Sequence, residues 1–337
     1  MGEHDPAGSG ETPVLDVRDL VVEFPGRRGV LTALRGISLT IARGEILGVV
    51  GESGAGKSLT GAAVIGLLEP PGRIGGGEIH VAGQRIDVLS RRDMAALRGR
   101  TLGAIFQDPL TSLNPLITVG DQLVETIRRH LPLSRDGAAR RAVALLHEVG
   151  IPSPELRVEQ YPHQFSGGMR QRVVIALALA GEPDLVIADE PTTALDVSIQ
   201  AQITALLKRI CRDRGTAIML VTHDMGVIAE TADRVAVMYA GRIVEMGPVD
   251  DIIGRPRHPY TRGLIGSIPS LFTHRERLLQ IDGAMPRLNA MPSGCAFHPR
   301  CEKADARCQA SVPALLPVGR AVAACWKPDM PGSKEAA

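Results

Sequence analysis

A glycine-rich run, GESGAGKS, occupies Gly51–Ser58 and matches the pattern G-x-x-x-x-G-K-[ST]. Glycines let such a loop turn its backbone N–H groups inward, where they bind phosphate at the start of a helix. Lys57 would add a positive charge beside the β- and γ-phosphates, and Ser58 a hydroxyl ligand for Mg²⁺. We therefore expect a nucleotide site with Mg²⁺, bound through Gly51, Ser53, Gly54, Gly56, Lys57, Ser58 and Leu59.

A second run, LVIADE, is apolar until it ends in two carboxylates, Asp189 and Glu190. At the end of a strand Asp189 would reach the metal ion, and Glu190 beside it would orient or deprotonate the attacking water. Acidic residues often end apolar strands, so the run alone is weak evidence. Together with the phosphate loop, it indicates hydrolysis of the nucleotide.

These residues must be positioned by strands, and the hydrophobic pattern predicts which ones. Glu45–Gly51, Leu185–Glu190 and Thr216–His223 are apolar almost throughout, which is typical of parallel strands buried on both faces. Gly76–Ile86 and Arg234–Gly247 each have the glycine-centred break of a hairpin. The sequence predicts an α/β fold with a mixed sheet core and an antiparallel β layer.

The chain divides into four stretches by composition. Residues 1–13 are small and polar, and we expect a disordered tail. We assign residues 14–253 to a nucleotide-binding domain, in which residues 108–169 have only helical periodicity and form an inserted helical subdomain. Residues 254–337 are rich in proline and cysteine, and we expect a separate, loop-rich C-terminal extension.

Charge and hydropathy exclude some classes of protein. The formal net charge is +1, so nothing indicates a nucleic-acid partner. The longest apolar runs, such as Val173–Ala180, are much shorter than the ~18 residues of a membrane span. We expect a soluble protein that acts at a membrane only through partners.

FSGGMRQR at Phe165–Arg172 resembles the signature sequence of ABC ATPases, although Phe165 and Met169 replace the usual Leu and Gln. The resemblance implies an ABC-type P-loop NTPase fold in which Ser166, Gly167 and Gly168 face ATP held by a second subunit. It also implies roles for residues that stand in order around the signature. Gln107 would contact the metal, His223 would contact the γ-phosphate and Glu190, Phe24 would stack on adenine, and Ala194–Asp196 would cross the dimer.

YPHQFSGGMRQRVVIALAL, DPLTSLNP and RPRHPYTRGLIGSIP resemble the ATPase subunits of bacterial oligopeptide and dipeptide importers. This resemblance covers Val14–Trp326. It implies an ATP-hydrolysing subunit on the cytoplasmic face of the inner membrane. Its expected partners are two transmembrane permease subunits, a second ATPase that we expect to be a paralogue, and an extracytoplasmic peptide-binding protein.

Three alternatives remain beside peptide import. The same group includes nickel and glutathione importers. An ABC ATPase of DNA repair or ribosome recycling is disfavoured, because the segment between Ser58 and Ser166 is too short for a long coiled coil and the chain has one ATPase domain. A module that binds nucleotide without hydrolysing it is disfavoured by the presence of Glu190 and His223.

Four of the five cysteines, Cys295, Cys301, Cys308 and Cys325, have the spacing C-x5-C-x6-C-x16-C. Disulfides are rare in the cytosol. Zinc ligands usually come in pairs about two to four residues apart, which are missing here, although His298 could complete a Cys₃His set. An iron–sulfur cluster also takes four thiolates, and the tail resembles the cysteine-rich extension of peptide-importer ATPases, some of which carry [4Fe–4S].

We therefore expect a [4Fe–4S] cluster, with zinc as the alternative, that stabilises the extension. Its loss should leave the phosphate loop able to bind ATP. The fifth cysteine, Cys211, stands alone in a helical stretch, and we expect a buried hydrophobic residue there.

Overall fold

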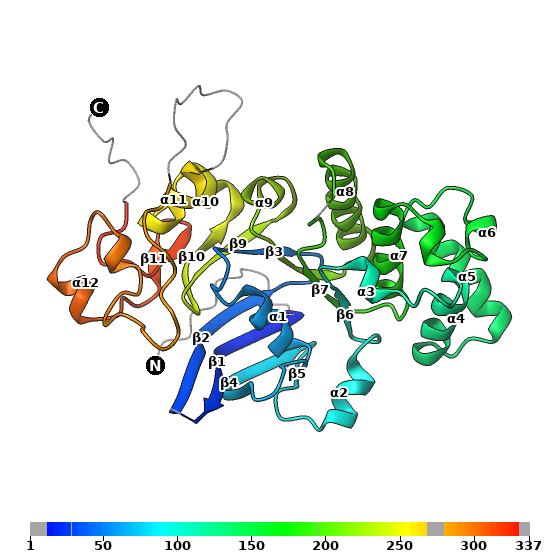
Figure 1. Cartoon of the computed structure of the whole chain (residues 1–337), viewed down its shortest axis with the longest axis horizontal. Helices are drawn as coiled ribbons and strands as arrows, with labels where there is room; N and C mark the ends of the chain where they lie inside the picture. The colour runs from blue at the N-terminus through cyan, green and yellow to red at the C-terminus, as the bar shows by residue number, and fades with distance from the viewer. Residues whose placement is uncertain (1–11, 28, 194, 268–279, 330–337) are drawn as a thin grey trace.

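The computed structural model describes residues 12–27, 29–193, 195–267 and 280–329, and two β-sheets form its centre (Figure 1). The strands are β1 (Leu15–Gly26), β2 (Gly29–Ile41), β3 (Ile46–Val50), β4 (Arg73–Val81), β5 (Gln84–Arg85), β6 (Leu102–Ile105), β7 (Leu185–Asp189), β8 (Ala217–Val221), β9 (Arg234–Tyr239), β10 (Arg242–Pro248), β11 (Leu316–Val318) and β12 (Ala321–Ala323).

The helices surround these sheets. They are α1 (Lys57–Val64), α2 (Arg91–Leu97), α3 (Pro109–Ser112), α4 (Val119–His130), α5 (Arg135–Glu148), α6 (Pro154–Arg157), α7 (Gly167–Leu179), α8 (Val197–Arg214), α9 (Met225–Thr231), α10 (Val249–Gly254), α11 (Pro259–Gly266) and α12 (Ala306–Ala310), with 3₁₀ turns η1 (Pro162–Gln164) and η2 (His298–Arg300). None of the helices in these described ranges is long and apolar enough to cross a membrane.

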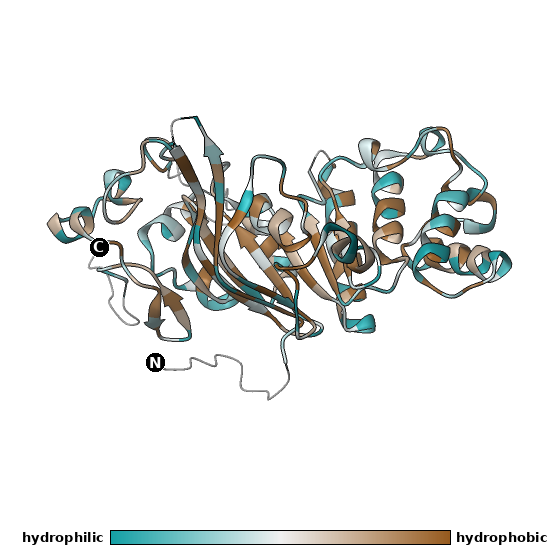
Figure 2. Ribbon diagram, turned by 90° about the horizontal axis from the view of Figure 1, so that it is seen from below, coloured by the Kyte–Doolittle hydropathy of each residue, from teal (hydrophilic) through white to brown (hydrophobic). Residues whose placement is uncertain are grey.

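The larger sheet has the order β11-β12-β10-β9-β3-β8-β7-β6. Its centre is parallel, because β3 pairs in parallel with β8 and β9, and β7 with β6 and β8. Every residue of β3 and β8 is buried, as expected for strands covered on both faces. Figure 2 shows these central strands as strongly hydrophobic. The expected mixed sheet core is confirmed.

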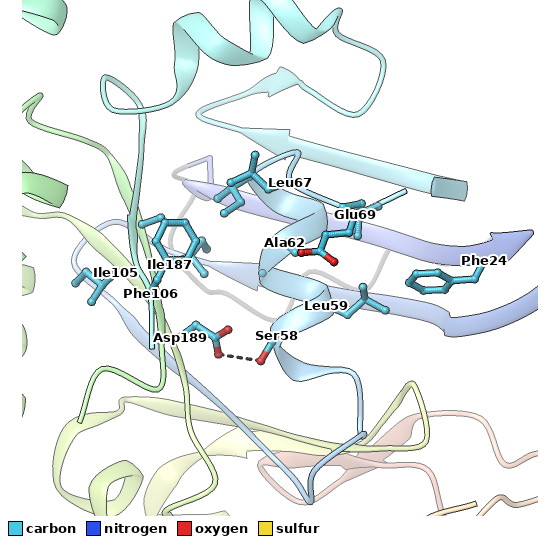
Figure 3. Close-up of a pocket in the computed structure, with 14 residues that line it drawn as sticks. Phe24, Ser58, Leu59, Ala62, Leu67, Glu69, Ile105, Phe106, Ile187 and Asp189 are labelled. Carbon is cyan, nitrogen blue, oxygen red and sulfur yellow. Dashed lines mark hydrogen bonds between the residues drawn. The ribbon is translucent and has the colours of Figure 1, made fainter. Parts of the chain in front are cut away.

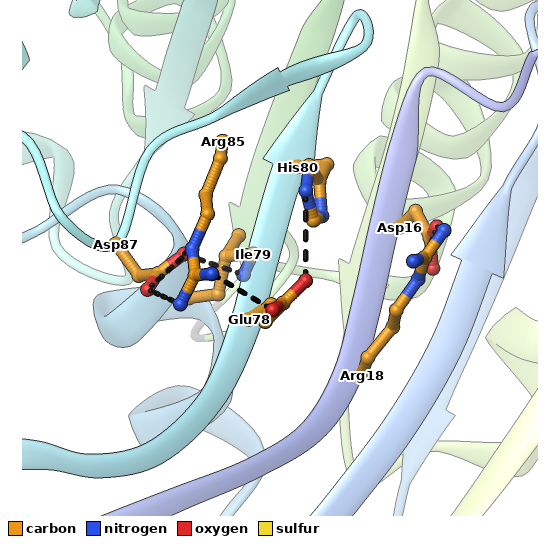
Figure 4. Close-up of polar contacts among 7 residues, drawn as sticks. All are labelled: Asp16, Arg18, Glu78, Ile79, His80, Arg85 and Asp87. Carbon is orange, nitrogen blue, oxygen red and sulfur yellow. Dashed lines mark hydrogen bonds and ion pairs between the residues drawn. The ribbon is translucent and has the colours of Figure 1, made fainter.

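The smaller sheet, β2-β1-β4-β5, is antiparallel. Its inner face contributes buried residues such as Leu20 and Ile79 to the core, and its outer face carries charged pairs (Figure 4). Arg85 bridges Glu78 at 2.7 Å and Asp87 at 3.0 Å. The exposed Arg85–Glu78 pair adds little stability, whereas the Asp87 side chain is only 5% exposed and its carboxylate also accepts from Ile79 N.

The helical segment after β6 packs on the core through α7. Thr118 and Ser134 cap the N-termini of α4 and α5 by accepting hydrogen bonds from Asp121 N and Gly137 N. The buried faces of both helices, with residues such as Leu123 and Leu145, join the larger hydrophobic core. Figure 1 shows α4–α6 and α12 at opposite ends of the molecule.

The C-terminal segment is attached to the larger sheet. β12 pairs with β10, with Glu245 opposite Ala323 and Met246 opposite Val322. The predicted segments 14–253 and 254–337 therefore share one sheet. Of the predicted N-terminal tail, residues 1–11 lie outside the described residues.

Candidate functional site

The phosphate loop connects β3 to α1, and two of its glycines are required by their surroundings. Gly51 has φ 153° and Gly56 has φ 104°, a region that other residues rarely adopt. A Cβ on Gly51 would lie 2.3 Å from the Met238 carbonyl oxygen, and one on Gly56 would lie 2.7 Å from Leu34 Cδ2. The loop therefore keeps its shape, and its backbone N–H groups their direction, only with glycine at these positions.

Lys57 lies inside the loop. Its Nζ donates to the carbonyl oxygen of Gly51 at 2.8 Å and to that of Glu52 at 3.1 Å. Burial lowers the pKa of Lys57, while the nearby carboxylates of Glu190, Asp189 and Glu52 act against this shift. An ammonium group in this position is placed to bind phosphate oxygens at the N-terminus of α1.

Ser58 and Asp189, two of the residues predicted to bind the metal ion, contact each other. Ser58 Oγ donates to Asp189 Oδ1 at 2.9 Å (Figure 3). Burial raises the pKa of Asp189, and the hydrogen bond from Ser58 acts against the rise. Mg²⁺ usually takes one or two protein oxygen ligands and completes its shell with phosphate and water, so this hydroxyl–carboxylate pair fits it.

Glu190 is held by three side chains that follow neighbouring parallel strands. Gln107 Nε2 donates to its Oε2 at 3.0 Å, Thr193 Oγ1 donates to the same oxygen at 2.9 Å, and His223 Nδ1 lies 3.2 Å from its Oε1. Burial alone would raise the pKa of Glu190, but the hydrogen bonds with His223 and Thr193 and the charges of His223 and Lys57 bring it below its usual range. The carboxylate stays ionised and oriented, as a group that activates water must be.

Thr193 was missed by sequence reasoning. Thr193 stands three residues after Glu190, and its N–H donates to the Glu190 carbonyl oxygen at 3.2 Å in a tight turn. That spacing is the feature of the sequence that could have predicted its role.

Most of the predicted nucleotide ligands open onto one cavity of about 690 Å³. Its walls include the phosphate loop, Gln107, Glu190 and His223, with Phe24 on one side and Leu288 of the C-terminal segment on another. A neighbouring, mainly apolar cavity of about 370 Å³ shares Phe24, Ser58 and Leu59 with it (Figure 3). Sequence reasoning did not predict that Leu288 lines the site.

Comparisons with known proteins agree with this geometry. Residues 34–193 match the ABC transporter family, and residues 244–308 match the family described as oligopeptide/dipeptide transporter, C-terminal region. The dipeptide transport ATP-binding protein DppD of Bacillus subtilis is 50% identical over 86% of each chain. The oligopeptide transport ATP-binding protein OppD of the same organism is 52% identical over 85% of this chain and 80% of its own.

Among solved structures, a dimeric post-hydrolysis state of the ATP-binding cassette MJ0796 bound to ADP and Pi is 26% identical with a TM-score of 0.62. It covers 70% of this chain and 98% of its own. The chain belongs to the ATPases of peptide ABC transporters. As such it hydrolyses ATP, and the expected ABC cassette fold is confirmed.

The signature of this ABC ATPase lies at the N-terminus of α7 and does not line the cavity. Ser166 Oγ accepts a hydrogen bond from Met169 N at 3.3 Å, and Ser166 and Gly167 are exposed. Phe165, which departs from the usual signature, is buried beneath the Arg157 guanidinium. One chain therefore supplies the phosphate loop to one surface and the signature to another.

Of the predicted dimer-crossing loop, Asp196 caps α8 by accepting from Ile199 N at 2.9 Å. Ala194 lies outside the described residues.

All five thiols of this ABC ATPase are free. Burial raises the pKa of Cys211 to about 12. Burial also raises the pKa of Cys325 to about 11, and the charges of Cys295, Cys301 and Cys308 add to the rise. The Cys295 N–H donates to the Cys308 carbonyl oxygen at 2.8 Å, so the backbones of these two cysteines are adjacent. Within the described ranges, however, no three His, Cys, Asp or Glu side chains are grouped around one metal position. His298 Nδ1 lies 2.9 Å from the Cys295 carbonyl oxygen.

Proposed function

We propose that this ABC ATPase powers a bacterial importer of dipeptides or oligopeptides from the cytoplasmic face of the membrane. The observation that carries the proposal is the match of residues 244–308 to the C-terminal region of oligopeptide/dipeptide transporters, because this segment lies outside the general ATPase core. The names of the B. subtilis relatives support the same cargo.

Two such ATPases would close head to tail on ATP. Lys57 and Ser58 would hold the phosphates and Mg²⁺ of one site, and the exposed Ser166–Gly168 turn of a second subunit would cover it. Support comes from the exposure of Ser166 and Gly167, and from the open space beside Gly167, where an added Cβ would meet no atom of the described residues outside its own helix and chain neighbours within 4 Å. The second subunit would be a paralogue, and the complex would include two permease subunits and an extracytoplasmic peptide-binding protein.

Hydrolysis would use the groups that surround Glu190. Its carboxylate would accept a proton from water, while Gln107, Thr193 and His223 keep it oriented. His223 would also contact the γ-phosphate. Release of phosphate would separate the two ATPases, and segment 108–169 would transmit the movement to the permease subunits.

We also propose that Cys295, Cys301, Cys308 and Cys325 hold a [4Fe–4S] cluster. The support is the donor set, four neighbouring thiols in one segment. A cubane cluster binds each thiolate at a different iron, whereas zinc gathers its ligands around one ion. The wide spacing C-x5-C-x6-C-x16-C, with no pair of cysteines two to four residues apart, favours the cluster over zinc. When bound, it would supply folding free energy to a segment with little apolar core.

The test is uptake by cells that lack the gene for this chain. Cells complemented with the wild-type chain should accumulate a radiolabelled dipeptide, and cells complemented with Glu190→Gln should not. Labelled nickel and glutathione are measured in parallel. If the wild-type chain restores uptake of nickel or of glutathione but not of the dipeptide, the proposed peptide cargo is wrong and the restored substrate is the cargo.

A further inference from the structure

Two side chains from the C-terminal segment converge on one residue of the phosphate loop, Glu52. Arg300 binds its carboxylate with both terminal nitrogens, Nη1 to Oε2 at 2.7 Å and Nη2 to Oε1 at 2.9 Å. The Tyr260 hydroxyl accepts a hydrogen bond from the Glu52 backbone N–H at 2.8 Å. Both the side chain and the backbone of Glu52 are therefore fixed by residues more than two hundred positions away in the sequence.

Arg300 is itself held firmly. Its side chain is 6% exposed, against 27% for that of Glu52. The guanidinium lies 5.8 Å from the ring centre of Tyr239 and 5.9 Å from that of Phe297. Its Nε donates to the Asp282 carbonyl oxygen at 2.8 Å. A bidentate pair in which the arginine is packed in this way fixes direction as well as distance.

Arg300 also joins the loop to the cysteine-rich segment. It ends η2 and directly precedes Cys301. On the other side of the pair, Glu52 directly follows Gly51, and its carbonyl oxygen accepts from Lys57 Nζ. The chain of contacts therefore runs from the cysteines through one ion pair to the lysine that binds phosphate.

We propose that Arg300 is a positioning residue for nucleotide binding, which holds the phosphate loop in its binding-competent shape and makes that shape depend on the fold of the C-terminal segment. A loop that is competent only part of the time binds nucleotide more weakly in proportion to that fraction. Saturating nucleotide selects the competent shape again, so loss of Arg300 raises KM and leaves kcat nearly unchanged. The proposal uses the ATPase activity alone and is independent of the cargo.

The experiment compares four single variants and one double variant of the full chain. Arg300→Met removes the ion pair, and Arg300→Lys keeps the charge without the paired geometry. Glu52→Gln breaks the same pair from the loop side and leaves the C-terminal segment unchanged. Arg307→Met is the matched control, since Arg307 stacks on Trp326 at 3.7 Å in the same segment and is exposed.

For Arg300→Met we expect the KM for ATP, and the Kd for MgADP by calorimetry, to rise about tenfold at unchanged kcat. Arg300→Lys should restore part of the affinity, Glu52→Gln should raise KM in the same direction, and Arg307→Met should match the wild type. The double variant Arg300→Met/Glu52→Gln should be no weaker than Arg300→Met alone, because both changes remove one interaction.

Wild-type KM in Arg300→Met would overturn the proposal. Equal losses of nucleotide affinity in Arg300→Met and Arg307→Met would also overturn it, because they would indicate general damage to the segment. Additive losses of affinity in the double variant would overturn it as well. If Arg300→Met does not fold, Glu52→Gln decides alone: an unchanged KM in that variant also overturns the proposal.

Discussion

At the scale of single residues, the site places two adjacent carboxylates in different environments. Asp189 and Glu190 are adjacent, yet burial raises the pKa of the first, while hydrogen bonds from His223 and Thr193 bring the pKa of the second below its usual range. Asp189 faces Ser58, and Glu190 faces the ends of β6 and β8. The neighbours of each carboxylate, and not its position in the sequence, therefore decide its chemistry.

Glu190→Gln should lower ATP hydrolysis by at least about two orders of magnitude and leave ATP binding nearly unchanged. The amide can still accept hydrogen bonds, but it takes no proton from water at neutral pH. Turnover is measured in the assembled transporter, and binding by calorimetry on the full chain. Undiminished turnover in this variant would show that Glu190 does not activate the attacking water.

Lys57→Ala should instead weaken ATP binding itself, by about tenfold or more, because it removes the charged hydrogen-bond donor of the loop. Calorimetry with the full chain measures the effect. Lys208→Ala is a suitable control, since Lys208 is a half-buried lysine of α8 that does not line the nucleotide cavity and donates to the Glu230 carbonyl oxygen. Equal affinity of Lys57→Ala and the wild type would contradict the assignment of the loop.

At the scale of elements, the start of α11 is anchored to β10 by one buried carboxylate. Glu245 is fully buried, and its two oxygens accept hydrogen bonds from Arg257 N at 2.6 Å and His258 N at 2.8 Å. Two residues later Tyr260 reaches the phosphate loop. Glu245 therefore sets the position of the helix from which Tyr260 contacts Glu52.

Glu245→Ala should lower the free energy of unfolding by about 3 kcal/mol, because it leaves two buried N–H groups without acceptors. Glu245→Gln keeps one carbonyl oxygen as an acceptor, so its free energy of unfolding should fall by less. Urea unfolding of the full chain measures both. Glu230→Ala, at an exposed position of α9, is the control, and a similar loss in that variant would show that the effect is unrelated to the anchor.

At the scale of the whole molecule, local patterns predicted most of the fold and part of the site. The parallel strands and the phosphate loop were predictable because apolar runs and glycine spacing act over a few residues. The pair between Arg300 and Glu52 was not, since it joins positions 248 residues apart and neither residue stands out in its own motif. For the same reason the continuation of the sheet by β12 was not expected from the proline- and cysteine-rich tail.

These contacts change what the loss of the proposed cluster should do. The sequence alone suggests that the phosphate loop would bind ATP independently of the tail, whereas the Arg300–Glu52 pair connects the two. The cysteine segment is therefore expected to influence nucleotide affinity through this pair.

Protein purified without oxygen should be brown and contain about four irons per chain. Changing Cys295, Cys301, Cys308 or Cys325 to Ser should remove the colour, because each thiolate binds a different iron, and Cys211→Ser should not. Cys301→Ser should also raise the KM for ATP in the same direction as Arg300→Met, since the residue next to Arg300 would lose its anchor. Metal analysis decides the identity of the centre: one zinc and no iron per chain would exclude the cluster, while a raised KM in that variant would still support the connection between the cysteine segment and the phosphate loop.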